Sequence, residues 1–261
     1  MGGQMKSGTT MLRMMLSRHS SIYSGLETHW FLDDLYANYD HELNNSIDKL
    51  KIFFNISTAE MNFIINETKS KNNVFINNFF NLIIQKENKN RWLEKTPDNI
   101  KYLPLIDSQW DEYKFIHVIR DYRDIYASWK LSNKYDMKYF IDQVKLSYEG
   151  NDQILGVTTS KYIEIKYEDI VLDTKKQIDK ILLFLNEDYE EDCISLDNKK
   201  AKKEFDIVHE VVGYKSNTLI STMEPINNNK IGQFKTVLTK KEIHLIEQEL
   251  SEYMDLFEYK N

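Results

Sequence analysis

A short run of small and polar residues near the start of the chain could bind an anion. Residues 6–10 read Lys-Ser-Gly-Thr-Thr and precede an apolar run of helical character at 11–16. A glycine-containing loop that leads into a helix points several backbone N–H groups at one spot, and the helix dipole adds positive potential there. We therefore expect a phosphate-sized anion, bound also by a lysine ammonium and three hydroxyl groups. The candidate ligands are Lys6, Ser7, Gly8, Thr9 and Thr10.

The loop has the glycine spacing of the Walker A motif of nucleoside triphosphatases but not its lysine. Gly3 and Gly8 fit G-x-x-x-x-G, yet Thr9 occupies the lysine position and Lys6 lies inside the loop. In a triphosphatase that lysine reaches the β- and γ-phosphates. The displaced lysine disfavours γ-phosphoryl transfer. The alternative to an anion-binding loop is an ordinary helix N-terminus that binds no ligand.

A second segment places an arginine where ligands usually bind in α/β proteins. Arg120 follows the β-forming run 115–119, and Ser128 falls in the predicted next helix. Ligands of open α/β sheets bind beyond the carboxyl ends of strands, so the guanidinium and the hydroxyl could contact one phosphate. A Walker B strand would end in an aspartate that serves Mg²⁺, so Arg120 favours a metal-free site. A structural ion pair between Arg120 and Asp124 is the alternative.

Taken together, these segments resemble the two signatures with which sulfotransferases bind 3′-phosphoadenosine 5′-phosphosulfate (PAPS). Residues 6–10 resemble the 5′-phosphosulfate loop, [RK]-S-G-T-T. Residues 118–128 resemble the R-D-P-R-D-x-x-x-S segment, whose first Arg and Ser bind the 3′-phosphate. The resemblance implies that role for Arg120 and Ser128, although Tyr122 replaces the usual proline.

Two later segments extend the resemblance. Residues 166–170 resemble [RK]-Y-E-D-L, which implies that Tyr167 lies near the adenine. Residues 231–235 resemble the G-R-W-[KR] segment near the nucleotide, which implies a nucleotide contact for Lys235. In this segment Gln233 and Phe234 replace the family's Arg and Trp.

The resemblance also proposes a general base. Glu27 lies in a Gly-x-Glu-Thr pattern that resembles tyrosylprotein and related bacterial sulfotransferases, in which this Glu is the base. An apolar wall would raise the pKa of the Glu27 carboxyl toward neutrality. His29 is the competing base or a partner, because cytosolic aryl sulfotransferases use a His. Their K-T-H segment corresponds here to 95–97, where Pro97 replaces the His. Lys95 matches the lysine that stabilises the transferring sulfonate, a role expected also of Lys6.

Composition limits the classes of function. The chain has 261 residues, enough for one α/β domain over residues 1–261, and a net charge of −7, which argues against nucleic-acid binding. A single cysteine, Cys193, and the lack of a long apolar run or signal peptide favour a cytoplasmic protein without a membrane span. The six histidines lack metal-site spacing, so we expect no metal.

The pattern of elements predicts a P-loop-like, three-layer α/β fold with a central parallel sheet. Strands are expected at 115–119 and 161–167. A first strand, cut short, is expected before the loop at 6–10. Helices are expected at 9–19, 124–131, 173–185 and from a capping box at Thr239 onward, and a helical cover at 35–90. Residues 190–235 lack a strong period and are expected to form a mobile lid.

The sequence thus predicts a sulfotransferase that moves the sulfuryl group of PAPS to an acceptor hydroxyl or amine and releases PAP, the 3′,5′-bisphosphate. Carbohydrate, lipid, small-molecule and peptide-tyrosine acceptors all remain open, as does the oligomeric state. The alternatives are a P-loop kinase or triphosphate hydrolase, which would need Mg²⁺, and a protein that binds PAP or PAPS without catalysis.

Overall fold

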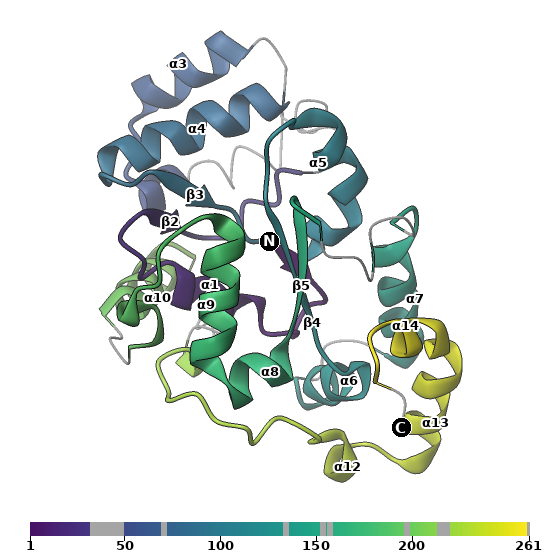
Figure 1. Cartoon of the computed structure of the whole chain (residues 1–261). Helices are drawn as coiled ribbons and strands as arrows, with labels where there is room; N and C mark the ends of the chain where they lie inside the picture. The colour runs from purple at the N-terminus through teal and green to yellow at the C-terminus, as the bar shows by residue number, and fades with distance from the viewer. Residues whose placement is uncertain are drawn as a thin grey trace.

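The computed structural model describes residues 1–31, 50–68, 72–132, 136–151, 155, 159–195, 199–212 and 220–259 (Figure 1). The strands are β1 (Gly2–Gly3), β2 (Ile22–Ser24), β3 (Arg91–Leu93), β4 (Phe115–Ile119) and β5 (Tyr162–Lys166). The helices of the first half are α1 (Thr9–Leu16), α3 (Thr58–Thr68), α4 (Asn72–Lys86), η1 (Pro97–Tyr102), α5 (Leu103–Gln109) and α6 (Tyr122–Leu131). Those of the second half are α7 (Met137–Tyr148), α8 (Tyr167–Leu172), α9 (Thr174–Leu185), η2 (Glu191–Ile194), α10 (Lys199–Val212), α12 (Phe234–Val237), α13 (Lys240–Glu249) and α14 (Ser251–Leu256).

Two parallel sheets organise the molecule. The central sheet has the order β1-β4-β5, in which Gly3 pairs with Val118 and Val118 pairs with Ile165. The second sheet pairs β2 with β3, so that Ser24 lies opposite Leu93. Because parallel strands end at the same edge, the residues that follow β1, β4 and β5 meet at one edge of the central sheet.

Helices cover both faces of the central sheet, which gives the expected three layers. Side chains alternate along β4: Ile116 and Val118 pack into a core with α1 and α9, whereas Phe115 and Ile119 pack into a second core with α5 to α7 and α14. All five residues of β4 are buried, as expected of a strand that is covered on both sides.

The cover predicted over 35–90 is mostly helical where it is described. Residues 50–54, α3 and α4 form it, and a capping box precedes α3, where Ser57 Oγ accepts from Glu60 N at 3.2 Å. Residues 35–49 lie outside the described ranges. Trp30 packs edge-on against Phe79, with ring centroids 4.6 Å apart, which fixes the segment after β2 under this cover.

Most predicted elements are confirmed, and four differ. The first helix, expected over 9–19, ends at Leu16. The strand over 161–167 ends at Lys166, because Tyr167 already begins α8. The final helix breaks at Leu250 into α13 and α14. Residues 199–212 form α10, an amphipathic helix, although the sequence of 190–235 shows no strong period; the mobile lid expected there stays a prediction. The expected short first strand is β1, with two residues.

None of the helices in the described ranges is both long enough and apolar enough to cross a membrane.

Candidate active site

The loop between β1 and α1 has the backbone of an anion-binding nest. Lys6 has a φ of 75° and Gly8 a φ of 101°, both in the left-handed region, and a turn hydrogen bond joins Ser7 N to Gln4 O at 2.9 Å. A non-glycine residue in this region is strained, and such strain is usually found at functional sites. Gly8 caps α1, so the first N–H groups of this helix have no intrahelical partner. The loop can therefore bind an anion through its backbone.

Side chains from β4 and α6 bind the carbonyl groups of the loop. Trp129 Nε1 donates to Met5 O at 3.0 Å, and Arg120 Nη1 donates to Lys6 O at 3.0 Å. With these two carbonyls turned toward α6 and the end of β4, the loop N–H groups remain for a ligand. Ser128, next to Trp129, is half-buried on α6.

Arg120 connects three segments of the site. Its Nη2 donates to Lys230 O at 2.6 Å, and its guanidinium lies 4.4 Å from the centroid of the Tyr167 ring. A Cβ at Gly8 would lie 2.6 Å from Tyr167 Cδ2, so this ring packs directly on the loop. The structure thus brings together Lys6, Gly8, Arg120 and Tyr167. The adenine contact of Tyr167 stays a prediction, since the residue is only 6% exposed.

Ser7 Oγ and Arg120 Nε, at this loop, are among the buried polar atoms that have no partner among the described residues. A buried donor without a partner is costly, which points to a ligand at such positions. Both groups are donors, and both suit the oxygen atoms of a phosphate or sulfonate. The residues present therefore fit the anionic end of a nucleotide.

Asp124 does not form the structural ion pair that was the alternative for Arg120. Its carboxylate accepts from Gly232 N at 2.7 Å and from Phe234 N at 3.0 Å, so it fixes the segment before α12. Lys235 is exposed on α12, and its ammonium lies 5.9 Å from the neighbouring Phe234 ring. This contact is local to α12, so the nucleotide role of Lys235 stays a prediction from sequence.

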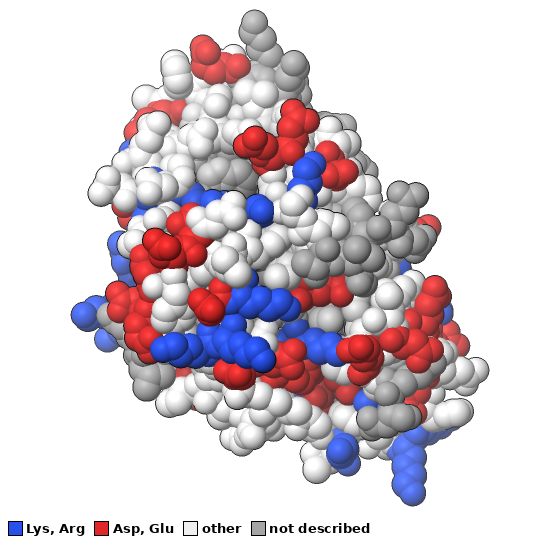
Figure 2. Space-filling model, viewed as in Figure 1, with Lys and Arg blue, Asp and Glu red and all other residues white. Residues whose placement is uncertain are grey.

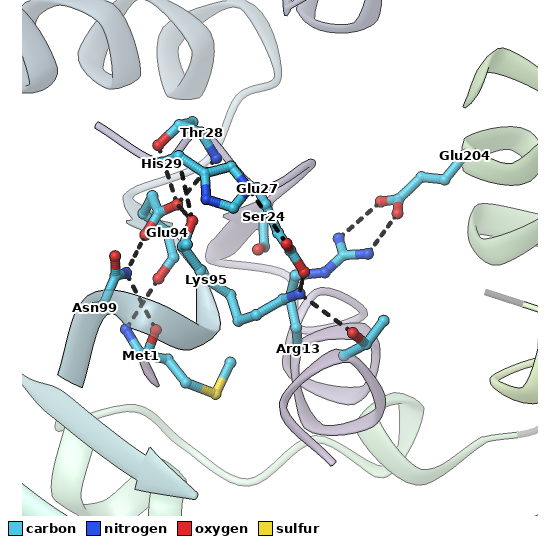
Figure 3. Close-up of polar contacts among 12 residues, drawn as sticks. Met1, Arg13, Ser24, Glu27, Thr28, His29, Glu94, Lys95, Asn99 and Glu204 are labelled. Carbon is cyan, nitrogen blue, oxygen red and sulfur yellow. Dashed lines mark hydrogen bonds and ion pairs between the residues drawn. The ribbon is translucent and has the colours of Figure 1, made fainter. Parts of the chain in front are cut away.

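Beyond the loop, Figure 3 shows the second group of predicted residues around Lys95. Lys95 is 2% exposed, and its ammonium donates to the Glu27 carboxylate and, at 3.2 Å, to Thr10 Oγ1. Glu27, Lys95 and Thr10 come from three segments far apart in sequence. The structure thus connects the proposed base to the phosphate loop through one ammonium group.

The electrostatics of this group correct one expectation. Burial alone would raise the pKa of Glu27, but the charge and hydrogen bond of Lys95, with smaller contributions from His29 and Arg13, lower it. The predicted rise toward neutrality is therefore wrong, because Lys95 and not an apolar wall is the main neighbour. Burial lowers the pKa of Lys95, against the attraction of Glu27. His29 is 56% exposed, and its Nε2 lies 3.6 Å from Glu27 Oε2.

Sequence reasoning missed the buried carboxylate that supports this group. Glu94 is 4% exposed and accepts from Thr28 N at 3.2 Å, Thr28 Oγ1 at 3.0 Å and Thr96 Oγ1 at 2.7 Å. Thr28 follows Glu27 and Thr96 follows Lys95, so Glu94 fixes the distance between the two side chains that are predicted to be catalytic. A charged residue directly after Trp92 and Leu93 of β3 was the available signal.

Sequence reasoning also missed a buried ion pair, which lies on the side of Glu27 away from Glu94 (Figure 3). Arg13 of α1 donates to both carboxylate oxygens of Glu204 on α10, at 3.0 and 2.6 Å, and their side chains are only 2% and 5% exposed (Figure 3). The signal was an arginine inside the apolar run 11–16. Glu204 gave none, because its segment shows no strong hydrophobic period.

Neither charge sign dominates the face of the molecule shown in Figure 2. Lys and Arg atoms form a band across its middle, bordered by Asp and Glu. Helix α9, which faces the viewer in Figure 1, carries the exposed Lys175, Lys176 and Lys180. Among the described residues, no group of three or more His, Cys, Asp or Glu side chains could bind a metal ion.

Comparison with known proteins gives a consistent result. Residues 1–191 match the model of the sulfotransferase family. The structure is similar to the sulfotransferase domain of the Synechococcus PCC 7002 olefin synthase (TM-score 0.64, 18% identity, covering 94% of this chain and 91% of that one). It is equally similar to the sulfotransferase domain of the curacin biosynthetic pathway (TM-score 0.64, 17% identity, covering 95% of each chain). The sequence has no match among curated proteins.

Proposed function

Because the chain belongs to the sulfotransferase family, we propose that it transfers the sulfuryl group of PAPS to a hydroxyl or amine acceptor. The observation that carries this proposal is the connection of Glu27 through Lys95 to Thr10 at the phosphate loop. A general base and an anion-binding site thus share one ammonium group. This arrangement suits a reaction in which the base activates an acceptor substrate that attacks a bound anionic donor.

PAPS, when bound, supplies an activated sulfuryl group on a good leaving group. The loop N–H groups and Ser7 Oγ bind the 5′ end, with Lys6 as a further charge. Arg120 and Ser128 bind the 3′-phosphate, and Tyr167 lies near the adenine. Fixed donors of this kind favour charge that develops on the leaving phosphate.

Glu27 accepts the proton of the acceptor as the new bond to sulfur forms. Its carboxylate is 36% exposed, so an acceptor can approach it, whereas Lys95 is buried. An anion at the loop competes with Glu27 for the Lys95 ammonium. That competition removes the main cause of the lowered Glu27 pKa, so donor binding makes the carboxylate a stronger base.

Nucleotide binding is the first test. Calorimetry with PAP, AMP and ATP should give at least tenfold tighter binding of PAP, because only PAP offers a 3′-phosphate to Arg120 and Ser128. Arg120→Gln should abolish the preference for PAP over AMP. Binding of ATP as tight as that of PAP, or a requirement for Mg²⁺, would support a triphosphate-dependent enzyme instead.

Transfer is the second test. Radiolabelled PAPS is offered with p-nitrophenol, a tyrosine-containing peptide, an amino-sugar oligosaccharide and a sterol. Glu27→Gln should lower turnover by about 10²-fold or more, since general base catalysis contributes that much, while PAP still binds at least as tightly because it no longer competes with Glu27 for Lys95. Turnover that survives Glu27→Gln but not His29→Gln would move the base to His29. PAP binding without transfer would support a non-catalytic role.

A further inference from the structure

The buried ion pair between Arg13 and Glu204 has no evident structural purpose. Arg13 is the charged residue within the apolar helix α1, and the pair is withdrawn almost completely from water. A buried ion pair adds little net stability compared with well-packed apolar residues, because both charges lose their hydration. The position of the pair therefore calls for another explanation.

That position is beside the catalytic group. In Figure 3 the Arg13 guanidinium lies between Glu204 on one side and the Glu27–Lys95 pair on the other. Four charges alternate in sign along this line: Lys95, Glu27, Arg13 and Glu204. Arg13 is among the groups that lower the pKa of both Glu27 and Lys95, so it lies within electrostatic reach of each.

We propose that Arg13 and Glu204 are positioning residues that set the basicity of Glu27, and that α10 thereby takes part in catalysis. The inference rests on the proposed role of Glu27 as the base. A guanidinium stays charged at every working pH and binds carboxylates through two parallel hydrogen bonds. Glu204 occupies those donors, so Arg13 acts on Glu27 as a nearby charge and not as a bonded partner.

The two residues then act on Glu27 in opposite directions. Without Arg13 a positive charge disappears, and the pKa of Glu27 rises. Without the Glu204 charge, the guanidinium is uncompensated and free to bind Glu27. The pKa of Glu27 then falls, and its oxygens are occupied. Removing both charges together restores the balance.

Other charged groups around the pair fix the conditions of the test. Glu27 also faces Lys95 and His29, Arg13 also faces Tyr23, and Glu204 also faces Lys200. Lys200 donates to Ser17 O at 3.1 Å, and burial lowers its pKa to about 8.

The charge of Lys200 is therefore constant only well below pH 8. The experiments are therefore done below that pH, and the background change His29→Gln removes the imidazole that faces Glu27.

The test is a titration of the Glu27 carboxyl carbon by NMR in protein labelled with ¹³C-glutamate, from pH 2.5 to 7. The variants are Arg13→Gln, Glu204→Gln and the double variant, with Glu27→Gln to assign the signal. The matched control is Glu210→Gln, which removes a negative charge from an exposed position of α10. We expect the pKa of Glu27 to rise in Arg13→Gln and to fall in Glu204→Gln. In the double variant it should return to the wild-type value, and in the control Glu210→Gln it should not change.

Glu27 pKa values that are unchanged, or that shift in the same direction in both single variants, would overturn the proposal. If Glu204→Gln does not fold, the rise in Arg13→Gln and its absence in the double variant decide the question. The titration needs no turnover, so its failure is distinct from failure of the proposed function. Failure of the proposed function would appear as full activity of Glu27→Gln.

Discussion

Gly8 is the residue at which the phosphate loop meets Tyr167. Its φ of 101° disfavours any side chain, and an added Cβ would lie 2.6 Å from the Tyr167 ring. Because that ring also contacts Arg120, a displaced ring would disturb the predicted binding groups for both ends of the nucleotide. This single position should therefore be intolerant of substitution.

We predict that Gly8→Ala lowers PAP affinity by at least tenfold and destabilises the protein by about 1–3 kcal/mol, from backbone strain and the clash together. Gly150→Ala is the matched control, since Gly150 has a φ of 77° but nothing within 4 Å of the added Cβ. It should show the strain alone, with PAP affinity unchanged. Calorimetry and chemical denaturation measure the two effects. Equal losses of affinity in both variants would contradict the role given to the Tyr167 contact.

Sequence revealed the residues whose chemistry is carried by a motif, and missed those defined by long-range contacts. Lys95 was matched to a sulfonate role, but its hydrogen bonds to Glu27 and Thr10 join residues that no local pattern relates. The direction of the Glu27 pKa shift was wrong for the same reason: it depends on which side chain lies opposite. Glu94 and Glu204 are buried acids whose partners only the folded chain identifies.

The elements of the site are joined by side chains that bind backbone groups. Asp124, at the start of α6, is the main example, because it fixes the segment 230–234 against the end of β4. In that segment the Lys230 carbonyl accepts from Arg120. The segment thus belongs to the predicted nucleotide site through its backbone, although its sequence departs from the family pattern.

We predict that Asp124→Asn lowers the free energy of unfolding by about 1–3 kcal/mol, because the amide nitrogen cannot accept one of the two hydrogen bonds. It should also weaken PAP binding several-fold, as the Lys230 carbonyl loses its fixed position. Asp136→Asn is the control: Asp136 accepts from Tyr139 N at 2.7 Å as the N-cap of α7. That change should cost little stability and leave affinity unaltered, because Asn caps a helix about as well as Asp. Unchanged PAP affinity in Asp124→Asn would contradict the role of the segment.

Elements with strong local signals were predicted well. The buried run of β4 and the capping boxes before α3 and α13 are encoded within a few residues. Helix α10 was missed because its polar, lysine-rich surface hides a narrow buried stripe that includes Ala201, Glu204 and Val208. One of those three is charged, so a hydrophobic period could not reveal the face that packs on α1.

For the whole molecule, carboxyl groups with opposite pKa shifts should give an acidic optimum of stability. Burial raises the pKa of Asp124 and Glu168 despite their hydrogen bonds. These two carboxyl groups bind protons more readily in the folded state. The free energy of unfolding therefore rises as the pH falls toward the pKa values that the groups have in the unfolded chain. For Glu27 and Glu242, neighbouring lysines outweigh burial and lower the pKa. These two groups stabilise the folded state above pH 4.5, the ordinary pKa of a glutamate. Their stabilisation is lost as the pH falls below that value.

We therefore predict that the unfolding temperature passes through a maximum on the acidic side of neutrality, where the two effects balance. Calorimetric scans from pH 3 to 8 at constant ionic strength measure it. Glu242→Gln, which removes the ion pair with Lys130 at 2.8 Å, should flatten the acid side of the curve. A steady fall of the unfolding temperature from pH 7 downward would contradict the assignment of raised values to Asp124 and Glu168.

The hydrogen bonds from Trp129 and Arg120 to the loop carbonyls have a consequence for the thermodynamics of recognition. A loop that is already constrained loses little conformational entropy when it closes on an anion, so more of the gross interaction energy remains as affinity. Such a preorganised loop can also discriminate between anions by shape, since it does not adapt to a poor fit. The tryptophan and the arginine thus contribute to affinity before any ligand arrives.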